Sequence, residues 1–167
     1  DEPRAGEVMV KVVSTGVCHS DWHVVKGDWT HVPMPVVLGH EASGTVEAVG
    51  PAVTTVKPGD HVILTWKPGC GRCEMCQQGW LTVCDLMPSV GSKPRSRASG
   101  QELNQLVGLG SFGSYTVVPE EAAVAVGPDI PFPQTAVVGC AVTTGVGAAI
   151  NTARVRPGTT VAVFGCG

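Results

Sequence analysis

Hydrophobic and polar residues alternate in short stretches through most of the chain, with turn-forming residues between them. Alternation with a period of two is typical of β-strands that bury one face. The turn sequence Lys57-Pro58-Gly59-Asp60 is one of the signals that separate these stretches. Strands are expected at Glu7–Val13, Ser43–Val49, His61–Trp66, Tyr115–Val118 and Ala122–Val126. Short strands with this spacing predict a small antiparallel barrel that extends to about residue 130.

The pattern changes near the end of this barrel. Residues from Ile130 to Ala153 form the longest uncharged stretch, but its prolines, amides and threonines, and its lack of leucine, argue against a membrane span. We expect a buried or interface helix over Gln134–Thr152, followed by a strand over Thr160–Phe164. A buried strand followed by G-x-G, here Gly165-Cys166-Gly167, is how a dinucleotide-binding βαβ unit begins. The chain contains only this first part of the longer glycine motif.

Residues 88–105 are polar, contain Lys93, Arg95 and Arg97, and lack apolar periodicity. This composition predicts a long surface loop, which is the best candidate for disorder in the chain.

The composition is that of a soluble globular protein, with 167 residues, 43% of them hydrophobic and 15% charged. This length is sufficient for one core and part of a second domain. The net charge of −3 provides no basic surface for nucleic acid. Because no secretory signal or membrane span is recognisable, we expect a cytoplasmic protein that binds neither nucleic acid nor a membrane.

Four of the seven cysteines form a C-x2-C-x2-C-x7-C run, namely Cys70, Cys73, Cys76 and Cys84. Gaps of two residues let neighbouring thiolates converge on one tetrahedral zinc ion. Disulfides are an alternative, but the odd number of cysteines and the missing extracellular signal argue against them. An iron–sulfur cluster is another, although the ferredoxin pattern places its fourth cysteine after three residues and follows it with proline. A closed site of four thiolates is structural and implies no catalysis by itself.

A second motif reads G-H-E-x2-G-x5-G-x2-V and begins at Gly39-His40-Glu41. It resembles the signature of the zinc-containing alcohol dehydrogenases of the medium-chain dehydrogenase/reductase family. The Cys70–Cys84 run resembles that family's structural-zinc lobe, and the segments Cys18–His23 and Gly139–Gly145 resemble those that hold its first and third catalytic ligands. The resemblance covers essentially the whole chain in the family's order. It leans toward the glutathione-dependent formaldehyde dehydrogenase branch without assigning it.

The resemblance implies a catalytic zinc site with Cys18, His40 and Cys140 as ligands and one position left open. A metal in such a site acts as a Lewis acid on an alcohol, whose hydride passes to a nicotinamide. With the four-cysteine site, this gives two zinc ions per chain. Each ligand alone would more often be a buried thiol or an ordinary histidine. Because residue 44 is glycine, the metalloprotease motif H-E-x-x-H is absent.

Roles in proton transfer follow from the same resemblance. Asp21 is expected to orient the liganding imidazole, and Glu41 to assist ligand exchange at the metal. Ser20 would take the alcohol proton, and His23 would pass it through coenzyme hydroxyls to solvent. The alternative for Ser20 and Asp21 is an N-cap of a short Trp22–Val25 turn, and the alternative for His23 is an exposed histidine.

Coenzyme and substrate contacts are also implied. The expected coenzyme contacts are His19, Thr144, Gly165 and Gly167, with His19 at a position where the family often has a pyrophosphate-binding arginine. Trp29 and Trp66 fall where the family lines its substrate pocket, although core packing is the alternative for both. Two indole rings would narrow this pocket and stack well on flat aromatic or unsaturated substrates.

We therefore expect a mainly β protein with some α structure. Its parts are a GroES-like β-barrel catalytic domain over residues 1–132 and the first helix and strand of a Rossmann-type domain over residues 133–167. Family members are roughly twice this length. The residue that selects NAD or NADP follows the last glycine by about twenty positions, so either coenzyme remains possible.

The expected function is zinc-dependent interconversion of alcohols and aldehydes or ketones by hydride transfer to or from NAD or NADP. This fragment is expected to be inactive alone, and the full-length protein to be a homodimer or homotetramer. One alternative is a non-enzymatic GroES-like zinc-binding structural or interaction module, against which the open three-ligand set argues. Another is zinc-dependent hydrolysis, against which the G-x-G turn argues.

Overall fold

Five antiparallel strands form the body of the computed structural model, which describes residues 2–88, 94 and 99–165. Their order across the sheet is β6-β1-β3-β4-β7. The strands are β1 (Glu7–Thr15), β3 (Ala42–Val49), β4 (His61–Leu64), β6 (Tyr115–Pro119) and β7 (Ala123–Val126). All five predicted strands are therefore present, with boundaries shifted by at most two residues.

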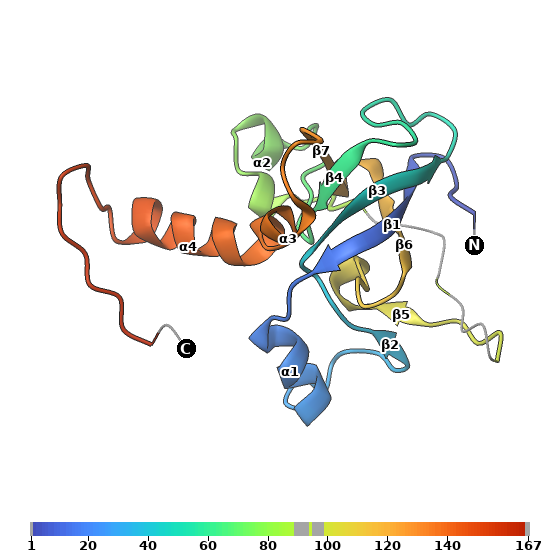
Figure 1. The fold of residues 1–167 in the computed structure, drawn as a ribbon, viewed down its shortest axis with the longest axis horizontal. Helices are drawn as coiled ribbons and strands as arrows, with labels where there is room; N and C mark the ends of the chain where they lie inside the picture. Colours follow the sequence, from blue (N-terminus) through green and yellow to red (C-terminus); the bar gives the residue numbers. More distant parts are fainter. Residues whose placement is uncertain (1, 89–93, 95–98, 166–167) are drawn as a thin grey trace.

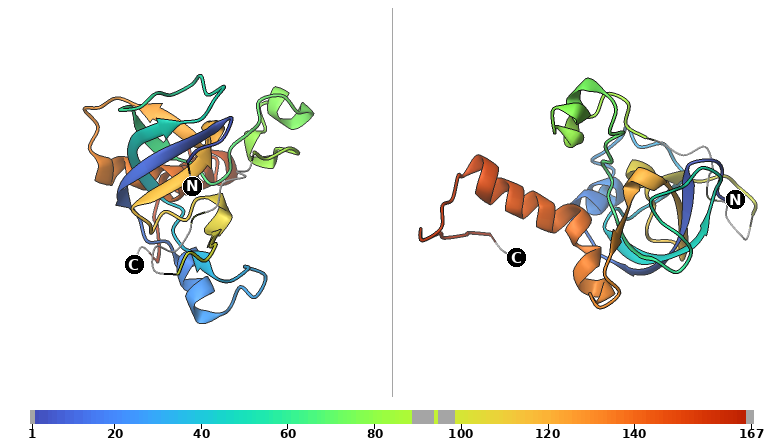
Figure 2. Two further views of the ribbon diagram at one scale, coloured as in Figure 1. Left: turned by 90° about the vertical axis from the view of Figure 1, so that its right-hand side faces the viewer. Right: turned by 90° about the horizontal axis from the view of Figure 1, so that it is seen from above.

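The sheet curls into a barrel. Its two edge strands, β6 and β7, are consecutive in the sequence and are joined only by a 3₁₀ turn over Glu120–Ala122, so the two edges must meet at that connection. Figure 2 shows this curvature in the view from above. Register shifts in the pairing of β1 with β3, between Met9 and Val10 and between Val12 and Ser14, help the sheet to bend. The predicted small antiparallel barrel is confirmed.

Valine side chains from alternating strand positions fill much of the barrel. Val8 and Val10 of β1, Val62 of β4 and Val118 of β6 are fully buried and pack in one cluster with Leu64. Branched side chains suit a pleated, half-buried surface, and each buried valine contributes about 1.5–3 kcal/mol. This core provides the rigid support for the groups described below.

Helix α1 (His19–Lys26) and a short parallel pair, β2 (Val36–Val37) with β5 (Asn104–Gln105), lie below the barrel in Figure 1. The helix is longer than the expected Trp22–Val25 turn. The β2–β5 pair was not predicted, because two residues per strand are too few to show a periodicity. Of the predicted loop over residues 88–105, residues 89–93 and 95–98 lie outside the described residues.

The segment after the barrel is helical, as predicted, but much of it is exposed. It consists of α3 (Phe132–Ala136), a π turn over Val138–Val142, α4 (Thr143–Gly147) and a second π turn over Ala148–Thr152. Its first turns pack on the barrel and bury Thr135 and Ala136, whereas Val146 and Ile150 are exposed. Figure 1 shows α4 projecting away from the barrel. The second half of the helix is therefore not buried within the described chain, and the interface alternative stays a prediction.

The predicted strand over Thr160–Phe164 is wrong. These residues are irregular and exposed, with Phe164 92% exposed. An apolar run shows a preference for the strand conformation but does not supply the neighbouring strand that the conformation needs. Within the described chain, no other segment pairs with these residues in a sheet.

Candidate functional site

Four cysteine side chains meet in a lobe that projects from the barrel (Figure 2), built by α2 (Glu74–Gln77) and a 3₁₀ turn over Leu81–Val83. The Sγ atoms of Cys70, Cys73, Cys76 and Cys84 all lie within 4.8 Å of one another. The Cys70–Cys76 and Cys73–Cys84 sulfur distances are 4.0 and 3.9 Å. Sulfurs placed tetrahedrally at about 2.3 Å from one ion are about 3.8 Å apart. The lobe therefore fits a closed zinc site.

Backbone N–H groups point at these sulfurs. The N–H of Cys70 donates to Cys84 Sγ at 3.3 Å, and that of Cys76 donates to Cys73 Sγ at 3.5 Å. The N–H of Cys76, followed by that of Asp85, lowers the pKa of the Cys73 thiol to about 6. Desolvation raises the pKa of Cys76 to about 12. A bound cation would favour ionisation of all four thiols, and none of the six described cysteines forms a disulfide.

A second group lies where α1, β3 and the C-terminal helical segment approach one another. Ligand atoms of Cys18, His40, Glu41 and Cys140 lie within 4.8 Å of one another. Cys18 directly precedes α1, His40 and Glu41 directly precede β3, and Cys140 lies in the π turn after α3. The structure thus brings together the three predicted ligands, with the predicted neighbouring glutamate beside them.

His40 is placed by a glycine in the left-handed region. Gly39 has a φ of +90°, and a β-carbon at this position would overlap Ser111 and Phe112. The carbonyl of Gly39 accepts the N–H of Ser111 at 3.0 Å, and that of Leu38 accepts the N–H of Phe112 at 2.9 Å. Only glycine satisfies both the conformation and the close approach. This is the structural reason for the glycine that precedes His40 in the motif.

Asp21 connects the Cys18 and His40 segments. Its Oδ1 accepts the N–H of Gly39 at 2.7 Å, and its Oδ2 accepts the N–H of Cys18 at 3.2 Å. The same Oδ2 lies 3.4 Å from His40 Nδ1, which has no well-aligned hydrogen bond to any described group although the imidazole is buried. A carboxylate facing Nδ1 leaves Nε2 for a metal, which is the usual arrangement behind a liganding histidine.

Neither Ser20 nor Asp21 is the N-cap of α1, which was the alternative to a role in proton transfer or histidine orientation. The cap of α1 is Cys18, and Asp21 occupies the third helical position, from which its carboxylate returns to the backbone N–H of the cap. This is the carboxylate half of a capping box. Asp21 therefore supports both the start of the helix and the histidine.

Cys140 reaches the group because α3 is anchored on the barrel. The hydroxyl of the fully buried Ser43 donates to the carbonyl of Phe132 at 2.7 Å, and the hydroxyl of Thr135 donates to the same oxygen at 3.1 Å. The Phe132 ring also packs on the imidazole of His61, with 4.5 Å between ring centroids. The sequence analysis missed these supports, because a hydrogen bond between distant segments leaves no local pattern.

Negative charge is concentrated around Cys140. Desolvation, together with interactions with Cys18 and the buried Glu41, raises the pKa of the Cys140 thiol to about 11. The Glu41 side chain is 3% exposed and packs on the backbone of Gly16, where a β-carbon would overlap its carboxylate. Two thiols and a carboxylate this close are mutually unfavourable as anions, and a divalent cation among them would reverse that effect.

His23 is held by residues that follow its helix. Its Nδ1 lies 2.8 Å from Asp28 Oδ2, a hydrogen bond that lowers the pKa of the Asp28 carboxyl. Its ring stacks on Trp29, with 5.8 Å between centroids and 14° between planes. The His23 side chain is 38% exposed and so reaches solvent. Ser20 is half-buried, and no hydrogen bond in the described chain joins it to His23.

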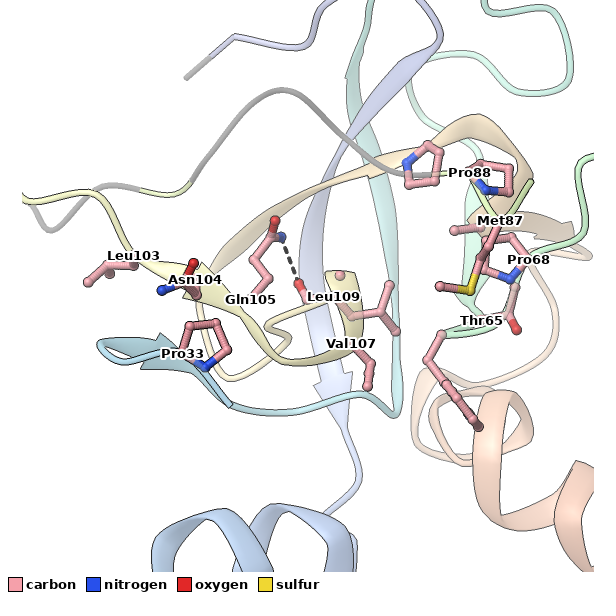
Figure 3. Close-up of a pocket in the computed structure, with 14 residues that line it drawn as sticks. Pro33, Thr65, Pro68, Met87, Pro88, Leu103, Asn104, Gln105, Val107 and Leu109 are labelled. Atoms are coloured by element: carbon pink, nitrogen blue, oxygen red, sulfur yellow. Dashed lines mark hydrogen bonds between the residues drawn. The ribbon is translucent and has the colours of Figure 1, made fainter. Parts of the chain in front are cut away.

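An apolar pocket of about 360 Å³ lies between the β2–β5 pair and the segment that leads into and out of the cysteine lobe (Figure 3). Thr65, Pro68 and Met87 face Pro33 and Asn104 across it. Trp66 is part of its lining, whereas Trp29 is not. None of the three predicted zinc ligands lines this pocket, so the substrate-pocket roles of both tryptophans remain predictions.

Three of the predicted coenzyme contacts are exposed, and the fourth is not described. His19 and Thr144 are exposed on α1 and α4, and Gly165, also exposed, has a φ of +76° in the irregular C-terminal segment. Gly167 lies outside the described residues. Their coenzyme roles remain predictions.

Comparison with known proteins agrees with this arrangement. Residues 4–129 match the family model for the alcohol dehydrogenase GroES-like domain. The chain belongs to this family. Over 172 aligned residues, this GroES-like domain protein is 44% identical to S-(hydroxymethyl)glutathione dehydrogenase from Escherichia coli. The alignment covers 99% of this chain and 47% of the relative. The chain therefore spans about half the length of the curated relatives it matches. The family resemblance read from the sequence is confirmed.

Solved structures support the same fold. The alcohol dehydrogenase zinc-binding domain protein from Burkholderia ambifaria superimposes with a TM-score of 0.81 at 39% identity, over 95% of this GroES-like chain and 45% of that one. Benzyl alcohol dehydrogenase from Acinetobacter calcoaceticus superimposes with a TM-score of 0.78 at 37% identity. The match covers 94% of this chain and 44% of that one. The predicted fold class is thus confirmed, and the relatives are oxidoreductases. No helix in the described part of the chain is long and apolar enough to cross a membrane.

Proposed function

We propose that this chain is the catalytic part of a longer zinc-dependent oxidoreductase that interconverts alcohols and aldehydes or ketones with NAD or NADP. The observation that carries the proposal is the convergence of Cys18, His40 and Cys140, with Asp21 behind the histidine. Two thiolates and one imidazole suit zinc and leave one coordination position for a substrate oxygen. The four-cysteine lobe would hold a second, structural zinc.

Zinc in the three-ligand group would act as a Lewis acid that lowers the pKa of an alcohol. The contribution of the chain is to hold the ligands in place. Asp21 fixes the orientation of His40 and of the segment that contains Cys18. Glu41, buried within 4.8 Å of the other ligand atoms, is positioned to assist when ligands exchange.

Proton transfer would use the N-terminal helix. The Ser20 hydroxyl would accept the alcohol proton, and His23, which is in contact with solvent, would release it. The hydrogen bond from His23 Nδ1 to Asp28 leaves Nε2 as the nitrogen that gains and loses the proton. Ser20 and His23 are not hydrogen-bonded to each other in the described chain, so hydroxyl groups of the bound coenzyme would carry the proton from Ser20 to His23.

The boundary between catalytic and coenzyme domains would fall near residue 132, where α3 begins. Residues 133–167 would then begin the Rossmann-type domain. His19, Thr144, Gly165 and Gly167 would contact the coenzyme, and the longer protein would be a dimer or tetramer. Exposure of Val146 and Ile150 on the second half of the helix agrees with a further domain against this surface.

The substrate is proposed to be a flat aromatic or unsaturated alcohol. Trp66 packs partly against the barrel core and also lines a mainly apolar pocket, and an indole in a substrate pocket would favour stacking with flat groups over contact with small aliphatic ones. The relative from Acinetobacter calcoaceticus is a benzyl alcohol dehydrogenase, in agreement with this class. The relative from Escherichia coli indicates the competing candidate, S-(hydroxymethyl)glutathione.

Steady-state kinetics of the longer protein would test the proposal. Alcohol oxidation should be seen with NAD or NADP, kcat/KM should be higher for benzyl alcohol than for ethanol, and Cys140→Ser should abolish turnover while one zinc remains bound. Ser20→Ala should lower kcat about 10²–10⁴-fold.

The 167-residue chain alone should show no turnover, because most of the coenzyme site is missing. Turnover that is independent of zinc and of both coenzymes, or a preference for ethanol, would contradict the corresponding part of the proposal.

A further inference from the structure

Helix α1 presents two histidines one turn apart on its surface. His19 and His23 are separated by four residues, which places them on the same face of the helix. Their ring centroids are 4.9 Å apart, with an angle of 64° between the ring planes. The His19 residue is exposed and the His23 side chain is 38% exposed. Neither residue belongs to the two cysteine-containing groups.

The separation of the rings matches a chelating pair. A zinc–nitrogen bond of about 2.0–2.1 Å places an imidazole centroid about 3.2 Å from the metal. Two imidazoles bound to one ion at nearly tetrahedral or octahedral angles therefore have centroids about 5 Å apart. The observed 4.9 Å agrees with this separation while both residues remain in the helix.

One of the two rings is already fixed by its surroundings. Asp28 Oδ2 lies 2.8 Å from His23 Nδ1, and Trp29 stacks on the same ring at 5.8 Å. A carboxylate on one ring nitrogen is the usual support of a metal-binding histidine, because it sets the tautomer and leaves the other nitrogen as the donor. Lys26 also contacts this carboxylate, at 3.5 Å, so Asp28 remains ionised without adding an unpaired negative charge.

We propose that His19 and His23 form a third metal site, which takes a divalent transition-metal ion that prefers imidazole, such as Zn²⁺, Ni²⁺ or Cu²⁺. Solvent completes the coordination, and Asp28 is a positioning residue that acts through His23. The site is open and has two protein ligands, so it binds more weakly than either cysteine-containing group. If the proposed function holds, a metal here occupies the nitrogen that His23 uses for proton release. Excess metal would then inhibit the longer protein.

The test is a nickel titration of the 167-residue chain preloaded with two equivalents of zinc. Isothermal titration calorimetry should detect one further equivalent of Ni²⁺, and the paramagnetic ion should broaden the imidazole NMR signals of His19 and His23. His19→Gln and His23→Gln should each abolish the third equivalent. Asp28→Asn should weaken it by about 10–100-fold, as expected for loss of an orienting carboxylate. Zinc content measured alongside shows that each variant retains its fold and its other metals.

His31→Gln is the matched control, since His31 lies outside helix α1 and contacts Trp29, with 5.8 Å between ring centroids, and should leave nickel binding unchanged. Absence of a third equivalent, or binding that survives His19→Gln, overturns the proposal. Equal loss in His31→Gln overturns the assignment to the helical pair. The titration measures no dehydrogenase turnover, so its outcome is independent of whether the proposed function is correct.

Discussion

Gly139 lies so close to the carbonyl group of Leu64 that no β-carbon fits between them. Leu64 is the last residue of β4 and is fully buried, so its carbonyl cannot move away without disturbing the barrel. Gly139 directly precedes Cys140. The missing side chain at residue 139 is therefore what lets the third proposed ligand come within reach of Cys18 and His40.

Gly139→Ala should push the π turn away from the barrel and displace the Cys140 sulfur. We expect the variant to keep the zinc of the four-cysteine lobe and to lose or weaken the other, so that metal analysis after dialysis gives about one zinc per chain instead of two. Gly145→Ala is the control. A β-carbon at residue 145 meets no atom within 4 Å, and alanine favours the helix, so this variant should retain both metals. Full occupancy in Gly139→Ala would refute the steric argument.

Asp21→Asn should weaken metal binding at the three-ligand group. The asparagine oxygen can still accept the N–H of Gly39, but the negative charge facing His40 Nδ1 is lost. Loss of such a carboxylate typically lowers metal affinity 10–100-fold. Competition with a zinc chelator would measure this, and Asp129→Asn, at an exposed site, should change nothing. Equal affinity in both variants would mean that Asp21 serves only to start the helix.

Ser43→Ala should destabilise the attachment of α3. The variant removes a buried hydroxyl that donates to the Phe132 carbonyl at 2.7 Å, while the Thr135 hydroxyl still reaches that oxygen. Because one donor remains, the expected loss in the free energy of unfolding is about 1 kcal/mol, measured by urea denaturation of the zinc-loaded chain. Ser114→Ala, at an exposed position, is the comparison and should have no measurable effect.

Local sequence patterns were sufficient for the barrel strands and for the four-cysteine group. Alternation identified β1, β3, β4, β6 and β7, and the spacing of the cysteines identified a lobe whose sulfurs meet at tetrahedral distances. Family resemblance was needed to connect Cys18, His40 and Cys140, since nothing local relates residues on three separate elements.

The errors have one physical cause. A local sequence pattern shows which conformation a segment prefers, but it does not show which other segments pack or pair with it. Thr160–Phe164 has the composition of a strand but no neighbouring strand in the described chain. The helix over Gln134–Thr152 was predicted from its apolar, uncharged composition, yet Val146 and Ile150 have no neighbour in the described chain that buries them. The supporting contacts of Ser43 and Gly139 depend on close packing between distant segments, which a single sequence does not reveal.

Alkylation of the zinc-free chain under reducing conditions should distinguish the cysteines of the lobe. The pKa of Cys73 is lowered to about 6 and that of Cys76 is raised to about 12, so at pH 7 Cys73 is mostly thiolate and Cys76 is a thiol. Because the thiolate is the nucleophile, peptide mapping should find Cys73 labelled well before Cys76. Labelling of Cys73 should slow as the pH falls through 6.

The same shift affects stability. The pKa of Cys73 is lower in the folded chain than in the unfolded chain, so its stabilising contribution is fully present above about pH 9 and disappears as the pH falls through about 6. The zinc-free lobe should therefore unfold more readily at pH 6 than at pH 8. In urea, where the N–H donors of Cys76 and Asp85 are no longer held near the sulfur, Cys73 and Cys76 should react at similar rates. Equal labelling of Cys73 and Cys76 in the folded chain would show that these donors do not stabilise the thiolate.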